Sequence, residues 1–147
     1  MIINNYRIFL PGDIQKEGMK IIIDNNHYLG NKLKGGVDVL ITPHHGLQSS
    51  FSTYLFDNMK DKKTRSLNIV SEKASDPDGT RFVDTRYSSS EYCMGRNNLS
   101  GRNGVEKCYQ VKTSRGHILI DYNPKSNPFF KICSNINDAI NFFVGKM

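Results

Sequence analysis

Two short motifs carry side chains that could bind a metal ion. Residues 10–13, Leu-Pro-Gly-Asp, end in the carboxylate of Asp13, and residues 41–46, Ile-Thr-Pro-His-His-Gly, contain the adjacent imidazoles of His44 and His45. A carboxylate together with imidazoles suits zinc, manganese or iron. A metal ion held there would activate a water molecule and stabilise the charge that develops on a phosphoryl or acyl oxygen.

Both motifs also have purely structural interpretations. Asp13 stands where a helix is expected to begin, and aspartate is among the best N-cap residues. Two histidines before a glycine can form a simple turn. If the pair ends a strand, the two side chains point to opposite faces, so at most one of them reaches a given ion. The residues alone leave both interpretations open.

Strands and helices are expected to alternate around these motifs. Strand formers over residues 6–10 precede the breaker Pro-Gly, and a helical pattern follows over residues 14–25. Residues 37–42 are typical of a strand buried on both faces. A helix capped by Ser49 or Ser50 is expected next, followed by a third strand over residues 66–71. Ligands of α/β sheets gather beyond the carboxyl ends of strands, so the two motifs are predicted to face one crevice.

The C-terminal half begins with a long polar segment at about residues 72–106, which is expected to be a loop. Alternating residues 107–113 and 117–122 predict a hairpin that turns at Gly116, and residues 128–133 predict one more strand. A closing helix is expected to carry an apolar stripe of Ile136, Ala139, Ile140, Phe143 and Val144. The fold class is therefore α/β, with a mixed sheet and flanking helices.

Length and composition favour one globular domain over residues 1–147. Apolar residues make up 37% and charged residues 23%. This composition is typical of a globular protein and not of a disordered one. No apolar run approaches the roughly 18 residues of a membrane helix, and the N-terminus does not resemble a secretory signal. The three cysteines fit neither a disulfide framework nor a zinc ribbon, so a cytoplasmic location is expected. The net charge of +6 makes nucleic acid or a phosphorylated substrate a candidate partner, although many proteins of this charge bind neither.

The order and spacing of the two motifs resemble the C-terminal half of a metallo-β-lactamase-fold hydrolase. The similarity is greatest to the hydrolase domain of bacterial competence DNA-uptake proteins, in which one strand ends in Gly-Asp and the next in Pro-His-His-Gly, usually followed by serine. Leu47 replaces that serine here. The similarity covers roughly residues 6–75, and residues 111–122 fit the closing strands of the family. It implies half of an αββα sandwich in which Asp13 bridges two metal ions. His44 is then favoured as the terminal ligand, with His45 supporting it or contacting the substrate.

One family signature is missing from this sequence. The His-x-His-x-Asp-His cluster, which supplies most of the metal ligands and the aspartate that orients the water, does not occur, and neither His27 nor His117 matches a family ligand. Catalytic zinc normally takes three protein ligands, which is more than the two motifs supply for a pair of ions. The sequence therefore identifies no catalytic residues. Zinc or manganese is expected only with a complementing half, supplied by another polypeptide or by a second copy in a homo-oligomer.

Three functional hypotheses follow. The first is a portion of a metal-dependent hydrolase of phosphodiester or nucleic-acid type, a nuclease-like domain. The second is a non-catalytic interaction module or truncated remnant of the same fold. The third is an unrelated α/β domain in which Asp13 is a cap and the histidines form a turn. Under the first, Arg81, Asp84, Arg86 and Tyr87 occupy a place where family members often contact substrate, although a solvated loop is the simpler interpretation.

Overall fold

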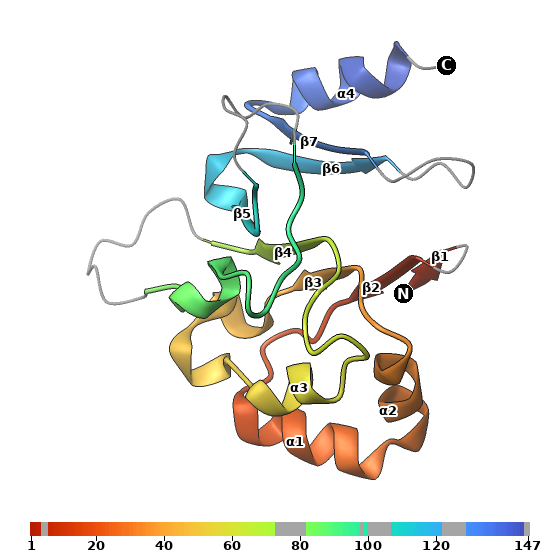
Figure 1. Cartoon of the computed structure of the whole chain (residues 1–147). Helices are drawn as coiled ribbons and strands as arrows, with labels where there is room; N and C mark the ends of the chain where they lie inside the picture. The colour runs from red at the N-terminus through yellow and green to blue at the C-terminus, as the bar shows by residue number, and fades with distance from the viewer. Residues whose placement is uncertain (4–5, 73–81, 98, 100–106, 122–128, 146–147) are drawn as a thin grey trace.

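Helices and strands form four layers in the computed structural model (Figure 1), which describes residues 1–3, 6–72, 82–97, 99, 107–121 and 129–145. Three helices cover one face of a five-stranded sheet. A two-stranded sheet covers the opposite face, and a fourth helix lies on the outside of that smaller sheet. The expected mixed α/β class is confirmed.

The larger sheet has the strand order β1-β2-β3-β4-β5. Its strands are β1 (Ile2–Ile3), β2 (Tyr6–Phe9), β3 (Val39–Ile41), β4 (Leu67–Val70) and β5 (Gln110–Lys112). Strands β2 to β5 are parallel, and only β1 runs antiparallel to its neighbour. Val39 and Leu40 of β3 are buried, in agreement with the strand predicted over residues 37–42, and every residue of β4, Asn68 included, is buried because the sheet is covered on both faces. The carboxyl ends of the four parallel strands therefore lie along one edge.

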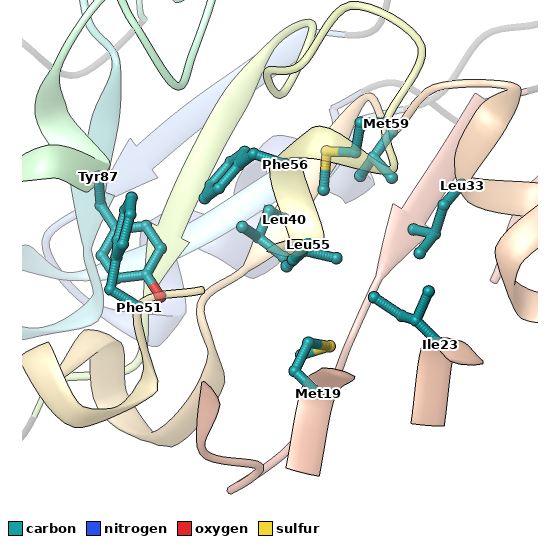
Figure 2. Close-up of a cluster of buried hydrophobic side chains, with 10 residues drawn as sticks. Met19, Ile23, Leu33, Leu40, Phe51, Leu55, Phe56, Met59 and Tyr87 are labelled. Atoms are coloured by element: carbon teal, nitrogen blue, oxygen red, sulfur yellow. The ribbon is translucent and has the colours of Figure 1, made fainter. Parts of the chain in front are cut away.

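The helical layer consists of α1 (Lys16–Asn25), α2 (His27–Lys34) and α3 (Thr53–Asp57). Two of these helices have side-chain caps, because Asn26 accepts from the backbone of Leu29 (3.0 Å) and Ser52 accepts from Leu55 (3.2 Å). Figure 2 shows the core between helices and sheet, where apolar side chains of all three helices meet a residue of β3. Its labelled members are Met19, Ile23, Leu33, Leu40, Phe51, Leu55, Phe56, Met59 and Tyr87.

The opposite face of the sheet is covered by β6 (His117–Asp121) and β7 (Phe129–Cys133), which pair antiparallel. A second core lies between the two sheets and joins β2–β5 to the smaller sheet through Phe130. Helix α4 (Ile136–Val144) packs on the outside, where Ala139 is buried. Its residues Ile136, Ile140 and Val144 share one face and are each more than half exposed, so only part of the predicted apolar stripe is covered.

Several expectations about local structure are wrong. The hairpin across Gly116 does not form, because β5 pairs in parallel with β4 whereas β6 belongs to the smaller sheet. Gly116 (φ 136°) instead carries the chain from one sheet to the other, and a Cβ atom there would lie 2.2 Å from the carbonyl oxygen of Cys133. Helix α2 was not expected. Ser52, not Ser49 or Ser50, caps α3.

The described part of the long polar segment is packed against the rest of the chain. It contains a short 3₁₀ helix (Thr85–Ser88) and three isolated bridges, which pair Val83 with Leu47, Cys93 with Thr64, and Arg96 with Cys108. Residues 82–97 are therefore a structured cover over the sheet and α3. None of the described helices is long and apolar enough to cross a membrane.

Candidate functional site

The two motifs meet at the carboxyl edge of the parallel sheet. The backbone N–H of His44 donates a hydrogen bond to the carbonyl oxygen of Gly12 (2.9 Å), which joins the segment after β2 to the segment after β3. The ring nitrogen Nδ1 of His45 lies 2.6 Å from the carbonyl oxygen of Ser71, the residue after β4. Asp13 and both histidines thus branch from neighbouring segments, which is the arrangement expected from the strand order.

The two histidines lie in a left-handed turn, not at the end of a strand. Strand β3 ends at Ile41, and the following turn places His44 at φ 43°, ψ 54° and His45 at φ 60°, ψ 17°. Left-handed backbone costs a non-glycine residue about 1–2 kcal/mol, so two such residues in succession are unusual. The argument from strand alternation therefore does not apply to this pair. Their ring centroids are 6.0 Å apart, with an interplanar angle of 48°.

Contacts from distant segments hold this turn. The hydroxyl of Ser50 lies 2.8 Å from the carbonyl oxygen of Pro43, at the start of the turn. The backbone N–H of Asp84 donates to the carbonyl oxygen of Gly46 (2.8 Å), at its end. Gly46 itself (φ 73°) is closely surrounded, because a Cβ atom there would lie 3.3 Å from Val83. A strained backbone conformation persists where surrounding contacts hold it, and these hydrogen bonds and the close packing around Gly46 hold the turn.

The hydrogen-bond partners identify which atoms are available to bind a ligand. A carbonyl oxygen only accepts, so the contact with Ser71 assigns the proton of His45 to Nδ1 and leaves the lone pair on Nε2. Nδ1 of His44 is buried without a partner among the described residues. The exposed carboxylate of Asp13 also has none there. Asp13 does not cap the helix, because α1 begins at Lys16 with Gln15 at the N-cap position.

The set of metal ligands is incomplete in the part of the chain that the structure describes. No group of three or more His, Cys, Asp or Glu side chains there could together hold a metal ion, Asp13, His44 and His45 included. Carboxylate and imidazole donors nevertheless have the chemistry that zinc or manganese requires. The site therefore offers separate donors at one edge, to which further ligands would have to be added.

The residues predicted to contact substrate have structural partners instead. Asp84 accepts hydrogen bonds from Nε (2.9 Å) and Nη2 (2.6 Å) of Arg86, and these bonds hold the pKa of Asp84 below its usual value. The guanidinium carbon of Arg86 lies 3.8 Å from the ring centroid of Phe51. Tyr87 is fully buried, and burial raises its pKa. This placement favours a role in packing for all three, whereas Arg81 lies outside the described residues.

A cleft lies beside the histidines. Leu10 and Ile41, one residue from each motif, line it as the predicted crevice requires, whereas Asp13, His44 and His45 do not. It has a volume of about 920 Å³ and lies between the carboxyl ends of β2–β4, the segment that leads into β6 and the first residues of α4. Glu72 borders it and binds Lys112 (2.7 Å) and Ser114 (2.5 Å). Burial raises the pKa of Glu72, but these two hydrogen bonds, together with the charges of Lys112 and Arg115, outweigh burial, so that the pKa is lowered. The sequence holds no local signal for this cluster, because its members are about 40 residues apart.

No protein-family model matches the sequence, and neither a curated protein nor a solved structure matches the chain. The geometry therefore provides two imidazoles and an exposed carboxylate on neighbouring segments at one sheet edge, without a complete set of metal ligands among the described residues.

Proposed function

We propose that this chain is the C-terminal portion of a metallo-β-lactamase-like hydrolase that cleaves phosphodiesters with a bound metal ion. The observation that carries the proposal is the hydrogen bond between His44 and Gly12, since it joins the two motifs on which the resemblance rests. The succession of layers in Figure 1, helices, sheet, sheet and helix, is also the one expected for an αββα sandwich. Strained backbone at both histidines is typical of functional sites.

In this proposal Asp13 and His45 bind the metal ion. His45 takes precedence over His44 as the ligand, because the carbonyl oxygen of Ser71 orients its ring and leaves Nε2 available. His44, whose backbone is fixed by Gly12, lies beside it and faces the substrate or a second ion. Zinc or manganese, when bound, would supply an activated water molecule and stabilise charge on the phosphoryl oxygens.

The remaining ligands come from a partner segment in this proposal. Catalytic zinc normally has three protein ligands, and the two motifs cannot supply a pair of ions alone. A polypeptide carrying the His-x-His-x-Asp-His cluster would complete the centre. A second copy of this chain would instead add its own Asp13 and His45. Light scattering with and without zinc separates these two arrangements, because only the second predicts a zinc-dependent dimer.

Metal binding by the purified full chain tests the proposal. After dialysis against zinc or manganese, bound metal is measured by mass spectrometry in the wild type, in Asp13→Ala and in His45→Ala. We expect a substantial fraction of one equivalent in the wild type and a loss in both variants. Asp57→Ala, which removes an exposed carboxylate on α3, is the matched control and should bind as the wild type does.

The same samples are then assayed for hydrolysis of bis(4-nitrophenyl) phosphate. Wild-type turnover that requires metal and is lost in Asp13→Ala supports the proposal. Less than about a tenth of an equivalent of either metal in the wild type, unchanged in Asp13→Ala, overturns it for this chain.

A non-catalytic interaction module is the second candidate. The exposed stripe of Ile136, Ile140 and Val144 on α4 favours it, because contiguous apolar surface often marks a protein interface. This function predicts self-association or partner binding that is indifferent to metal. Ile140→Lys would weaken such association, whereas it should leave metal binding by Asp13 and His45 unchanged, because Ile140 does not line the cleft beside them.

A further inference from the structure

The cleft beside the histidines combines an apolar wall with polar residues on a fixed turn. Leu10, Ile41 and Ile69 line it from the larger sheet, and Ile118 and Ile120 line it from β6. Its volume of about 920 Å³ lies within the range of small-molecule sites, about 300–1,000 Å³. Ser71, whose carbonyl oxygen contacts His45, is part of the lining, so the cleft opens next to the candidate metal ligands.

The charged cluster on one wall of this cleft consists of Glu72, its ion-pair partner Lys112 and Arg115, which together carry a charge of +1. Arg115 is exposed and lines the cleft, and the described residues offer it no hydrogen bond or ion pair. Glu72 is the carboxylate on this wall, and Lys112 compensates its charge at 2.7 Å. His117 lies on the same wall and is also exposed. The charge of Arg115 also lowers the pKa of Glu72, but the carboxylate forms its ion pair with Lys112, so the guanidinium of Arg115 has no hydrogen bond to a described residue and can donate to an anionic ligand.

The turn that carries Arg115 is held in place before any ligand binds. Thr113–Arg115 forms a short 3₁₀ turn. The backbone N–H of Glu72 donates to the hydroxyl of Thr113 (3.0 Å), and the hydroxyl of Ser114 donates to the Glu72 carboxylate (2.5 Å). Glu72 thus fixes the two residues before Arg115. A preorganised donor binds more tightly, because less conformational entropy is lost on binding.

We propose that this cleft binds a phosphate-bearing organic ligand of nucleotide size. Arg115 binds the phosphate, since the planar guanidinium matches two phosphate oxygens at once. The apolar wall of Leu10, Ile41 and Ile118 takes the flat organic group. This inference deepens the proposed function by naming the substrate-binding residue of the same site, but the binding itself does not require the metal ion.

Binding of three probes to the metal-free full chain tests the inference. Adenosine 5′-monophosphate, adenosine and inorganic phosphate are titrated in the presence of a chelator and followed by NMR. We expect the nucleotide to bind at least about tenfold more tightly than either of its parts. Arg115→Ala should weaken nucleotide binding by about ten- to a hundredfold, the effect of losing hydrogen bonds to a charged group. Arg115→Lys should lie between the two.

Lys60→Ala is the matched control, because Lys60 is an exposed cation that follows α3 and does not line the cleft. The inference is overturned by equal losses in Arg115→Ala and Lys60→Ala, by unchanged binding in Arg115→Ala, or by the absence of nucleotide binding at millimolar concentration. Nucleotide binding without metal binding or hydrolysis would refute the proposed function and leave this inference standing.

Discussion

Replacing Asp84 with alanine is expected to destabilise the fold. Its side chain is only 6% exposed and accepts three hydrogen bonds from Arg86, from the backbone N–H (2.9 Å), Nε (2.9 Å) and Nη2 (2.6 Å). The guanidinium of Arg86 in turn lies over the ring of Phe51 in the core. Removal of the carboxylate leaves that guanidinium against an aromatic ring without its counter-charge.

The size of the effect follows from these contacts. Hydrogen bonds to charged groups contribute about 1.5–3 kcal/mol each. The side chain of Arg86 is 42% exposed, so water replaces part of what is lost, and we expect a total of about 2 kcal/mol in the free energy of unfolding. In a domain of this size that corresponds to a fall in melting temperature of about 4–8 °C.

The effect should also depend on pH. The Arg86 hydrogen bonds lower the folded-state pKa of Asp84, so its contribution is fully present above the unfolded pKa of about 3.9 and is lost as pH falls through the folded value. Urea unfolding followed by circular dichroism at pH 7 and at about pH 3.5 measures both effects. Asp57→Ala is the control, since its carboxylate is 58% exposed and should change stability by less than about 0.5 kcal/mol. An Asp84→Ala variant as stable as the wild type at pH 7, or equally destabilised at both pH values, would refute the reasoning.

Two further predictions concern the histidine turn and the cysteines. Gly46→Ala should lower the free energy of unfolding by about 2 kcal/mol in a thermal or urea melt, because a left-handed alanine is strained and its Cβ would press on Thr42 and Val83; a neutral effect would contradict the placement of this turn. Cys93 should resist a thiol reagent at pH 8 until the protein unfolds, since burial raises its pKa to about 11 and all three cysteines are buried; labelling of one thiol in the native protein at the rate of free cysteine would show that prediction to be wrong.

Elements with strong local patterns lie close to where the sequence predicts them. The apolar strand β3 and the closing helix α4 are both found, because a continuous apolar run and a helical stripe each identify one element type. Helix α2 was missed because Leu29 and Leu33 are its only large aliphatic residues and Gly30 interrupts it. The partner of β5 could not be predicted, since its pairing with β4 joins residues about 40 positions apart.

The sequence predicted which segments would meet at the site but not their backbone conformation. Strand order alone brings the segments after β2 and β3 together, so the contact of Gly12 with His44 follows from local patterns. The polar context of Asp84 and Tyr87 resembles a solvated loop, yet the structure buries both side chains. Tyr87 packs against Phe51, more than 30 residues earlier in the chain, and no local pattern contains that information.

The identity of the residues in the turn after β3 carries the strongest argument for where this chain acts. A turn that served only the fold would use glycine or asparagine, which adopt left-handed backbone at little cost. His44 and His45 adopt it instead, at about 1–2 kcal/mol each. Hydrogen bonds with Gly12, Ser71 and Asp84, which lie in three separate segments, stabilise this strained turn. The turn places the two imidazoles with their ring centroids 6.0 Å apart, on the segment next to that of the exposed Asp13 carboxylate and beside the cleft. This placement of two imidazoles on strained backbone is the feature on which the proposed metal site depends.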